Sequence, residues 1–178
     1  MEVTIRNQKG IHLLTMKVVD GVGVFDHKSY RDLFLESIRY CQENKGMDVF
    51  AYVIMPDHVH MIIQSRIGLL SDLLRDFKKF TSKKIVASMI ATNDYRLDWM
   101  LKRFEFAVRR HTRNERYQFW ENGNNPREID TVHEMNEAIE FVHQNPVRAG
   151  FVESAEAYLY SSARNFSNQS ALVEIIYT

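Results

Sequence analysis

The sequence predicts an α+β fold in which helices pack on one face of a small antiparallel sheet. Short segments rich in Val, Ile and Thr, which are typical of strands, alternate with longer segments whose apolar residues recur every three or four positions. Their order is strand, helix, two strands, helix, and later a further strand and helix, which indicates one sheet with helices against it. Because 45% of the 178 residues are hydrophobic and no interior linker is evident, residues 1–178 are expected to form a single domain.

The first half of the chain contains three of the predicted strands. The predicted elements are a strand over residues 11–19, a helix over 29–44, and strands over 48–55 and 58–64. Ser29 is expected to cap the helix, with Asp32 as an acidic capping-box partner. Pro56-Asp57 predicts a turn, so the two strands that flank it should form a hairpin.

The second half is mostly helical. The predicted elements are helices over residues 69–91, 97–108 and 132–144, and a short strand over 127–130. The first helix carries a stripe of apolar residues at helical spacing, namely Leu70, Leu73, Leu74, Phe77 and Phe80. Thr131 and Glu134 form a capping box that opens the last helix, which must end before Pro146.

The most informative motif is the pair His58 and His60 at the start of the third predicted strand. Side chains at i and i+2 of a strand share a face, so both imidazoles should project together while Val59, Met61 and Ile63 pack on the other face. Two converging imidazoles are half of a metal site. The simpler interpretation is two polar residues on the solvent face of an edge hairpin.

The last predicted helix carries Phe141 on its polar face. Its apolar stripe consists of Val132, Met135, Ile139 and Val142. Phe141 lies nearly opposite this stripe. Either a loop covers its ring, or this second face of the helix borders a site. Asn145 lies four residues further on and shares that face, so its amide oxygen could complete a metal site begun by His58 and His60.

Two groups of basic residues stand out, although 23 basic and 23 acidic side chains give a formal net charge of zero. The first, on the long helix, consists of Arg75, Lys78, Lys79, Lys83 and Lys84. The second, which precedes several aromatic residues, consists of Arg109, Arg110, Arg113 and Arg116. Cations follow phosphates and rings such as that of Trp120 stack on bases, so this pattern suits single-stranded nucleic acid. The alternative for either group is a solvated helix face.

The composition predicts a reducing, aqueous environment. Cys41 is the one cysteine, so an internal disulfide cannot form. The N-terminus lacks the apolar core of a signal peptide, and no apolar run approaches the ~20 residues needed to span a bilayer. We therefore expect a soluble, cytoplasmic protein that does not bind membranes.

Five segments in a fixed order carry a resemblance to a known family. They are residues 52–63, 76–84, 119–121, 141–150 and 158–165. Together they resemble the IS200-like single-strand DNA transposases, whose signature is a His-hydrophobic-His (HUH) motif, and more narrowly the tyrosine transposases associated with repetitive extragenic palindromes (REP). One His-x-His is common, whereas five ordered segments that extend over the chain from about Ile11 are specific.

This resemblance implies a ferredoxin-like core with the histidine pair on a central strand. It implies cleavage of single-stranded DNA at or near a hairpin, in which a tyrosine hydroxyl attacks a phosphate, a 5′-phosphotyrosine forms, and a strand 3′-hydroxyl later reverses the step. The metal ligands would be His58, His60 and Asn145. The family uses Mg²⁺ or Mn²⁺, and two imidazoles suit Mn²⁺ better. Relatives act as homodimers with shared sites or as monomers, and both states stay open here.

One position departs from the family pattern. Where the motif has its nucleophilic tyrosine, this chain has Phe141, which lacks the oxygen. The first hypothesis is therefore a transposase-family protein that binds hairpin or single-stranded DNA, with or without a metal ion, and that has no tyrosine-mediated strand transfer. A second is an active nicking enzyme in which Tyr117, Tyr158 or Tyr160, or a water on the metal, replaces the nucleophile. A third is a metal-binding interaction module that does not bind nucleic acid.

Overall fold

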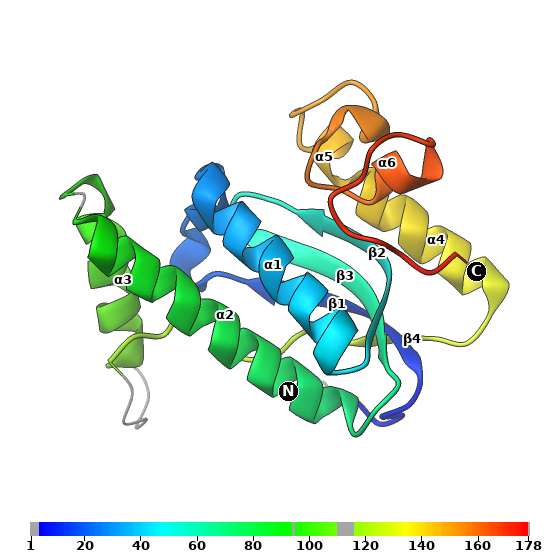
Figure 1. Cartoon of the computed structure of the whole chain (residues 1–178), viewed down its shortest axis with the longest axis horizontal. Coiled ribbons are helices and arrows are strands. Elements are labelled where there is room, and N and C mark those ends of the chain that lie inside the picture. The colour runs from blue at the N-terminus through cyan, green and yellow to red at the C-terminus, as the bar shows by residue number, and fades with distance from the viewer. Residues whose placement is uncertain (1–3, 94, 110–115, 178) are drawn as a thin grey trace.

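The computed structural model describes residues 4–93, 95–109 and 116–177. Its centre is a four-stranded antiparallel sheet with the strand order β2-β3-β1-β4 (Figure 1). The strands are β1 (Ile11–Lys17), β2 (Met47–Ile54), β3 (His58–Ser65) and β4 (Arg127–Ile129). The strand that carries both histidines, β3, is therefore an interior strand, as the family resemblance implies.

Helices fill the rest of the chain. The α-helices are α1 (Lys28–Asn44), α2 (Leu70–Thr92), α3 (Asp98–Val108), α4 (Val132–His143), α5 (Asn145–Arg148) and α6 (Ala163–Phe166). Short 3₁₀ turns are η1 (Val19–Gly21), η2 (Val24–Asp26), η3 (Tyr95–Leu97) and η4 (Ala155–Ala157). Each predicted strand and long helix is present, with ends within two residues of those predicted. None of the helices in the described ranges is long and apolar enough to cross a membrane.

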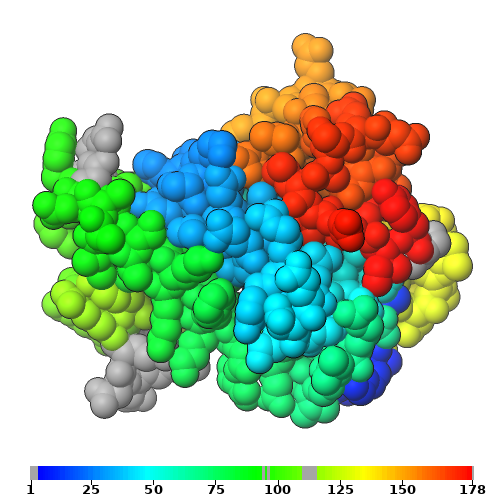
Figure 2. Space-filling model, in the orientation of Figure 1, coloured from blue at the N-terminus to red at the C-terminus, as the bar shows by residue number. Residues whose placement is uncertain are grey.

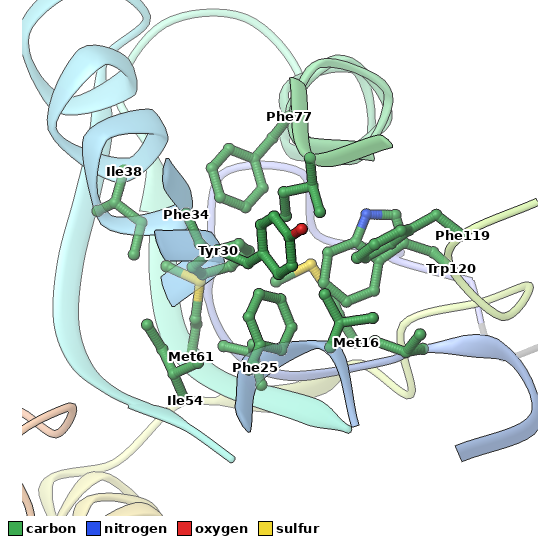
Figure 3. Packing of buried hydrophobic residues seen from close by; sticks show 14 of the residues in the cluster. Met16, Phe25, Tyr30, Phe34, Ile38, Ile54, Met61, Phe77, Phe119 and Trp120 are labelled. Carbon is green, nitrogen blue, oxygen red and sulfur yellow. The ribbon is translucent and has the colours of Figure 1, made fainter. Parts of the chain in front are cut away.

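One face of the sheet is covered by α1 and α2. Met16, Ile54 and Met61 point to this face from three different strands and pack with rings such as Phe34 and Phe77 (Figure 3). The ring centroids of Phe34 and Phe77 lie 5.2 Å apart in an edge contact. This is the larger core, and the sheet order with two helices on one face is the ferredoxin-like arrangement.

The opposite face of the sheet is covered by α4, which corrects the expectation that the helices lie on one face only. Leu13, Ala51 and Ile62 alternate along their strands with residues of the larger core and pack with Met135 and Val142 of α4. The α+β class is confirmed, but chain order alone does not say on which side of a sheet a later helix packs. Because helices cover both faces, every residue of β2 is buried.

The helix starts show one correct and one incorrect prediction. In the capping box of α4, the backbone N–H of Glu134 donates to Oγ1 of Thr131 at 3.2 Å, and the backbone N–H of Thr131 donates to the Glu134 carboxylate at 3.0 Å. The predicted Ser29 cap is wrong, because α1 begins one residue earlier with His27 at its N-cap. The carboxylate of Asp32 pairs with a lysine one turn earlier instead.

Two residues of the predicted apolar stripes are exposed. The relative exposure is 46% for Phe80 and 78% for Val132. Phe80 stacks on Tyr40 of α1 at the outer edge of the helix pair, with ring centroids 6.0 Å apart. The buried stripes of α2 and α4 are therefore narrower than the sequence pattern predicts.

The open edge of β2 is covered by the chain that follows α5. Ser161 forms a bridge with Val53, and the backbone N–H of Ile54 donates to the carbonyl of Tyr160 at 2.9 Å. Further on, the backbone N–H of Ile176 donates to Val49 at 2.8 Å, and Figure 2 shows this C-terminal segment in red beside α1. Covering an edge strand removes a site for unwanted pairing.

Candidate functional site

His58 and His60 lie on the face of β3 that α4 covers. In the pairing of β3 with β1, His60 is opposite Thr15 and His58 is opposite Lys17. The two imidazole centroids are 4.9 Å apart, with ring planes at 74°. The rings therefore lie side by side, as their spacing in the sequence predicts.

One nitrogen of each imidazole is held by a neighbouring oxygen. Nδ1 of His58 lies 2.6 Å from Oδ1 of Asp57, and Nδ1 of His60 lies 2.9 Å from Oγ1 of Thr15. A carboxylate only accepts, so Nδ1 of His58 carries a proton and donates it to Asp57. In the bond between His60 and Thr15 either the imidazole N–H or the hydroxyl can donate. Oxygen partners of this kind orient histidines that bind metals through Nε2.

His60 is held in its neutral form. Its side chain is buried, and this burial lowers the pKa of His60 to about 4, with further contributions from the nearby His58 and Lys17. A neutral imidazole has the lone pair that a metal ion needs. At neutral pH, His60 is therefore in the protonation state of a metal ligand.

Phe141 lies against the histidine pair. Its ring centroid is 5.0 Å from that of His60, at an interplanar angle of 71°. The guanidinium carbon of Arg148 lies 5.6 Å from the Phe141 ring centroid. The second face of α4 is thus turned toward the histidine strand, so the ring packs on β3 rather than under a loop.

Asn145 follows Phe141 by one helical turn. The intervening Gln144 has φ −78° and ψ −6°, so the backbone stays helical between α4 and α5. Residues four apart on such a segment are neighbours on its surface. Asn145 is partly buried, and its spacing puts it on the same face of the helical segment as Phe141.

The residue types at this place are ones that bind divalent ions. The two imidazoles offer ring nitrogens, and the amide of Asn145 would offer an oxygen. Within the described ranges, no three His, Cys, Asp or Glu side chains are grouped so that they could hold an ion. A metal beside the histidine pair would therefore take its remaining ligands from Asn145, from water or from a substrate.

The three tyrosines considered as substitute nucleophiles lie in different surroundings. Tyr117 and Tyr160 pack with the core on the α1 and α2 side, across the sheet from the histidines. Tyr158 packs with both cores, including the one beside α4. Its hydroxyl donates to the carbonyl of Ile54 at 2.9 Å. Of these three, Tyr158 alone reaches the histidine face of the sheet.

The basic group of α2 lies on the face of the sheet away from the histidines. Arg75 and Lys84 form ion pairs with carboxylates of α2 and α1. Lys78 donates from Nζ to two carbonyl oxygens in the loop before β4, at 3.0 Å each. Lys79 and Lys83 are exposed. Much of the charge in this group is therefore matched within the protein.

The second basic group is only partly described. Arg110 and Arg113 lie outside the described residues. Arg109 is exposed, and Arg116 pairs with Glu105 at 3.4 Å. The role of this group in DNA binding stays a prediction.

Trp120 belongs to the core, which corrects its assignment as a base-stacking residue. Its exposure is 6%, and its ring lies 4.7 Å from Phe119 and 6.1 Å from Phe34, centroid to centroid (Figure 3). Its indole N–H donates to the carbonyl of Lys78 at 3.2 Å. Proximity to basic residues in the sequence does not make a ring accessible. Exposed rings elsewhere in the chain include that of Trp99 on α3, with 51% exposure.

Four residues at the site were not predicted from the sequence. Thr15 and Lys17 come from β1 and are found only when the register of β1 against β3 is known. Asp57 was assigned only to the turn. Arg148 could have been predicted from the sequence, because it follows Phe141 by seven residues, or two helical turns, and so shares its helix face.

Comparison with known proteins identifies a family and a structural relative. The family model "Transposase IS200 like" matches residues 11–129, which is more than half of the chain and ends before α4. One solved structure, of a REP-associated tyrosine transposase bound to a REP hairpin, superposes with a TM-score of 0.67 at 14% identity, covering 100% of this chain and 95% of that one. No curated protein matches the sequence. The chain belongs to the IS200-like transposase family.

Proposed function

We propose that this chain binds hairpin or single-stranded DNA at a metal-dependent transposase site that lacks its tyrosine nucleophile. The observation that carries the proposal is the contact between Phe141 and His60, 5.0 Å between ring centroids. In the family that the sequence resembles, a tyrosine at this position attacks the phosphate. Phenylalanine fills the same space and cannot do so.

Hairpin DNA is the proposed partner because of the structural relative. That protein, a REP-associated tyrosine transposase, is bound to a REP hairpin, and its fold matches over the whole of this chain. The family match supports a DNA partner independently of the fold.

His58, His60 and Asn145 are the proposed ligands of Mg²⁺ or Mn²⁺. A divalent ion bound there would polarise a phosphodiester and orient it. Asp57 and Thr15 hold the two imidazoles by their Nδ1 atoms, so each ring is oriented before a ligand arrives. Burial keeps His60 neutral, which leaves its Nε2 able to coordinate at neutral pH.

The test measures DNA and metal binding separately. A fluorescent hairpin oligonucleotide should bind more tightly than a blunt duplex of the same stem. Calorimetry with Mn²⁺ should show binding that His58→Ala or His60→Ala abolishes. His133→Ala is the matched control, because His133 is an exposed histidine of α4 whose partner is Glu137.

Two results would contradict the proposal. Absence of DNA binding even at low salt, where phosphate contacts are strongest, would favour an interaction module that does not bind nucleic acid. Equal Mn²⁺ affinity in wild type and His60→Ala would place the metal elsewhere.

A second candidate function is strand cleavage with Tyr158 as the nucleophile, which its packing on the histidine face favours. It predicts that the protein nicks a labelled hairpin in Mn²⁺, and that Tyr158→Phe removes this activity. Tyr160→Phe is the control, since Tyr160 packs on the other face. An intact oligonucleotide at high protein concentration excludes this candidate.

A further inference from the structure

Two cationic side chains flank the histidine pair and belong to neither basic group of the sequence. Lys17 is the last residue of β1 and is directly opposite His58 in the sheet register. Arg148 ends α5, and its guanidinium carbon is 5.6 Å from the ring of Phe141, which in turn contacts His60. The row therefore runs from Lys17 through His58, His60 and Phe141 to Arg148, with a cation at each end.

The two cations face the same side of the sheet as the imidazoles. Lys17 is two residues from Thr15, whose hydroxyl bonds to His60, so the two β1 side chains share a face. Lys17 is exposed, and its charge acts on His60 across this face. Arg148 is exposed and reaches the same place from α5.

Neither cation is matched by a carboxylate in the part of the chain that the structure describes. There, the side chains of Lys17 and Arg148 make no hydrogen bond or ion pair, and the contact of Arg148 is with the apolar ring of Phe141. Arg75 and Lys84 of α2, in contrast, are both in ion pairs. Exposed cations that no carboxylate matches are available for an anion beside the histidine pair.

We infer that Lys17 and Arg148 each bind a phosphate group of the DNA strand, on either side of the histidine pair. This inference rests on the proposed function, and it names the residues that hold the strand across the site. A guanidinium can bind two phosphate oxygens at once, whereas the lysine ammonium acts as a point charge. The two residues act by positioning the strand, and they do so whether or not it is cleaved.

The first test is the salt dependence of hairpin binding. Each phosphate contact that is lost should reduce the slope of log K against log salt by about 0.7 for single-stranded DNA. Lys17→Ala and Arg148→Ala should each show this change and bind roughly tenfold more weakly at low salt. Lys45→Ala and Arg66→Ala are the controls, since Lys45 follows α1 and Arg66 follows the far end of β3.

A second pair of variants separates charge from packing at Arg148. Arg148→Leu keeps an apolar side chain over Phe141 and removes the charge, so it should lose the same salt slope as Arg148→Ala. Arg148→Lys should keep the slope with weaker binding. If Arg148→Leu binds like the wild type, then Arg148 only covers the ring and the inference is wrong for this residue.

The decisive test replaces single phosphates by neutral methylphosphonates along the oligonucleotide. In the wild type, a methylphosphonate at one linkage should weaken binding because the contact with Arg148 is lost. A methylphosphonate at a different linkage should weaken binding because the contact with Lys17 is lost. In Arg148→Ala the first substitution should no longer weaken binding, and in Lys17→Ala the second should no longer do so, because the contact is already absent. If the wild type binds the hairpin and no linkage shows this coupling, the inference fails while the proposed function stands. If the wild type binds no DNA, the proposed function itself fails.

Discussion

The ring of Phe141 lies 5.0 Å from His60 and 5.6 Å from the guanidinium carbon of Arg148. Around it, both imidazoles have Nδ1 engaged by oxygen, which leaves Nε2 available for a ligand. At the scale of single residues, the function we propose assigns these groups to a metal ion and a phosphate. Under that proposal, Phe141 lacks the hydroxyl oxygen that would attack.

The bond between Thr15 and His60 gives a prediction at this scale. Thr15→Val keeps the shape of the side chain and removes the oxygen 2.9 Å from Nδ1 of His60. Loss of such a partner typically lowers metal affinity about 10- to 100-fold, and we expect this loss for Mn²⁺ in calorimetry. Thr92→Val, at the exposed end of α2, is the control. An Mn²⁺ affinity equal to that of the wild type would show that Thr15 does not orient the ring.

At the scale of elements, α4 is held to the sheet by apolar packing along one face and by a hydrogen-bonded connection at its C-terminal end. One side packs Met135 and Val142 onto the strands. At its C-terminal end, the ring of His143 bonds through Nε2 to the hydroxyl of Ser162 at 2.8 Å. Ser162 in turn bonds to the backbone of Tyr52 in β2. These contacts fix the helix that carries Phe141.

Ser162→Ala tests this connection. The hydroxyl accepts from the backbone N–H of Tyr52 at 2.9 Å and is fully buried. Its removal leaves that N–H and the Nε2 of His143 without their partner, which should cost about 1–3 kcal/mol of unfolding free energy. Urea denaturation measures the loss. Ser167→Ala is the control, since Ser167 is exposed, and a similar small loss in both variants would contradict the account.

The sequence predicted the local features of the site because these depend on local periodicity. The shared face of His58 and His60 follows from the two-residue period of a strand, and the face of Phe141 follows from the helical period. Thr15 could not be predicted, because its contact with His60 depends on the register of two strands. Trp120 was misplaced because burial depends on tertiary packing.

At the scale of the whole molecule, the order of strands and helices gave the α+β class but not the side on which α4 packs. That side decides the site, because α4 brings Phe141 to the histidine face. The net charge of zero likewise does not describe the surface. Much of the charge on α2 is paired within the protein, whereas Lys17 and Arg148 beside the histidines remain available to an anion.

Stability should fall in mild acid because of buried histidines. Burial lowers the pKa of His143 to about 4 and that of His60 in the same way. An unfolded histidine titrates near 6.5, so between pH 6.5 and 4 the unfolded chain binds protons that the folded chain does not. The free energy of unfolding should therefore be lower at pH 5 than at neutral pH by about 2 kcal/mol per histidine.

Urea denaturation at pH 7.5 and pH 5 measures this loss. His143→Gln should lose less stability than the wild type over the same interval, because one of the two titrating groups is gone. His133→Gln is the control, because His133 is exposed on the surface of α4. An identical pH dependence in His143→Gln and the wild type would show that His143 is not buried in its neutral form.

The central claim, a strand-transfer site that lacks only its nucleophile, is tested most directly by Phe141→Tyr. The variant and the wild type are incubated with a 3′-labelled hairpin oligonucleotide and Mn²⁺, because a 5′-phosphotyrosine keeps the 3′ fragment on the protein, and covalent protein–DNA adducts are separated on a denaturing gel. We expect no adduct with the wild type, an adduct with Phe141→Tyr, and none when His60→Ala is combined with it. A variant that binds DNA and Mn²⁺ normally but forms no adduct, or a wild-type adduct that His58→Ala removes, would contradict the claim.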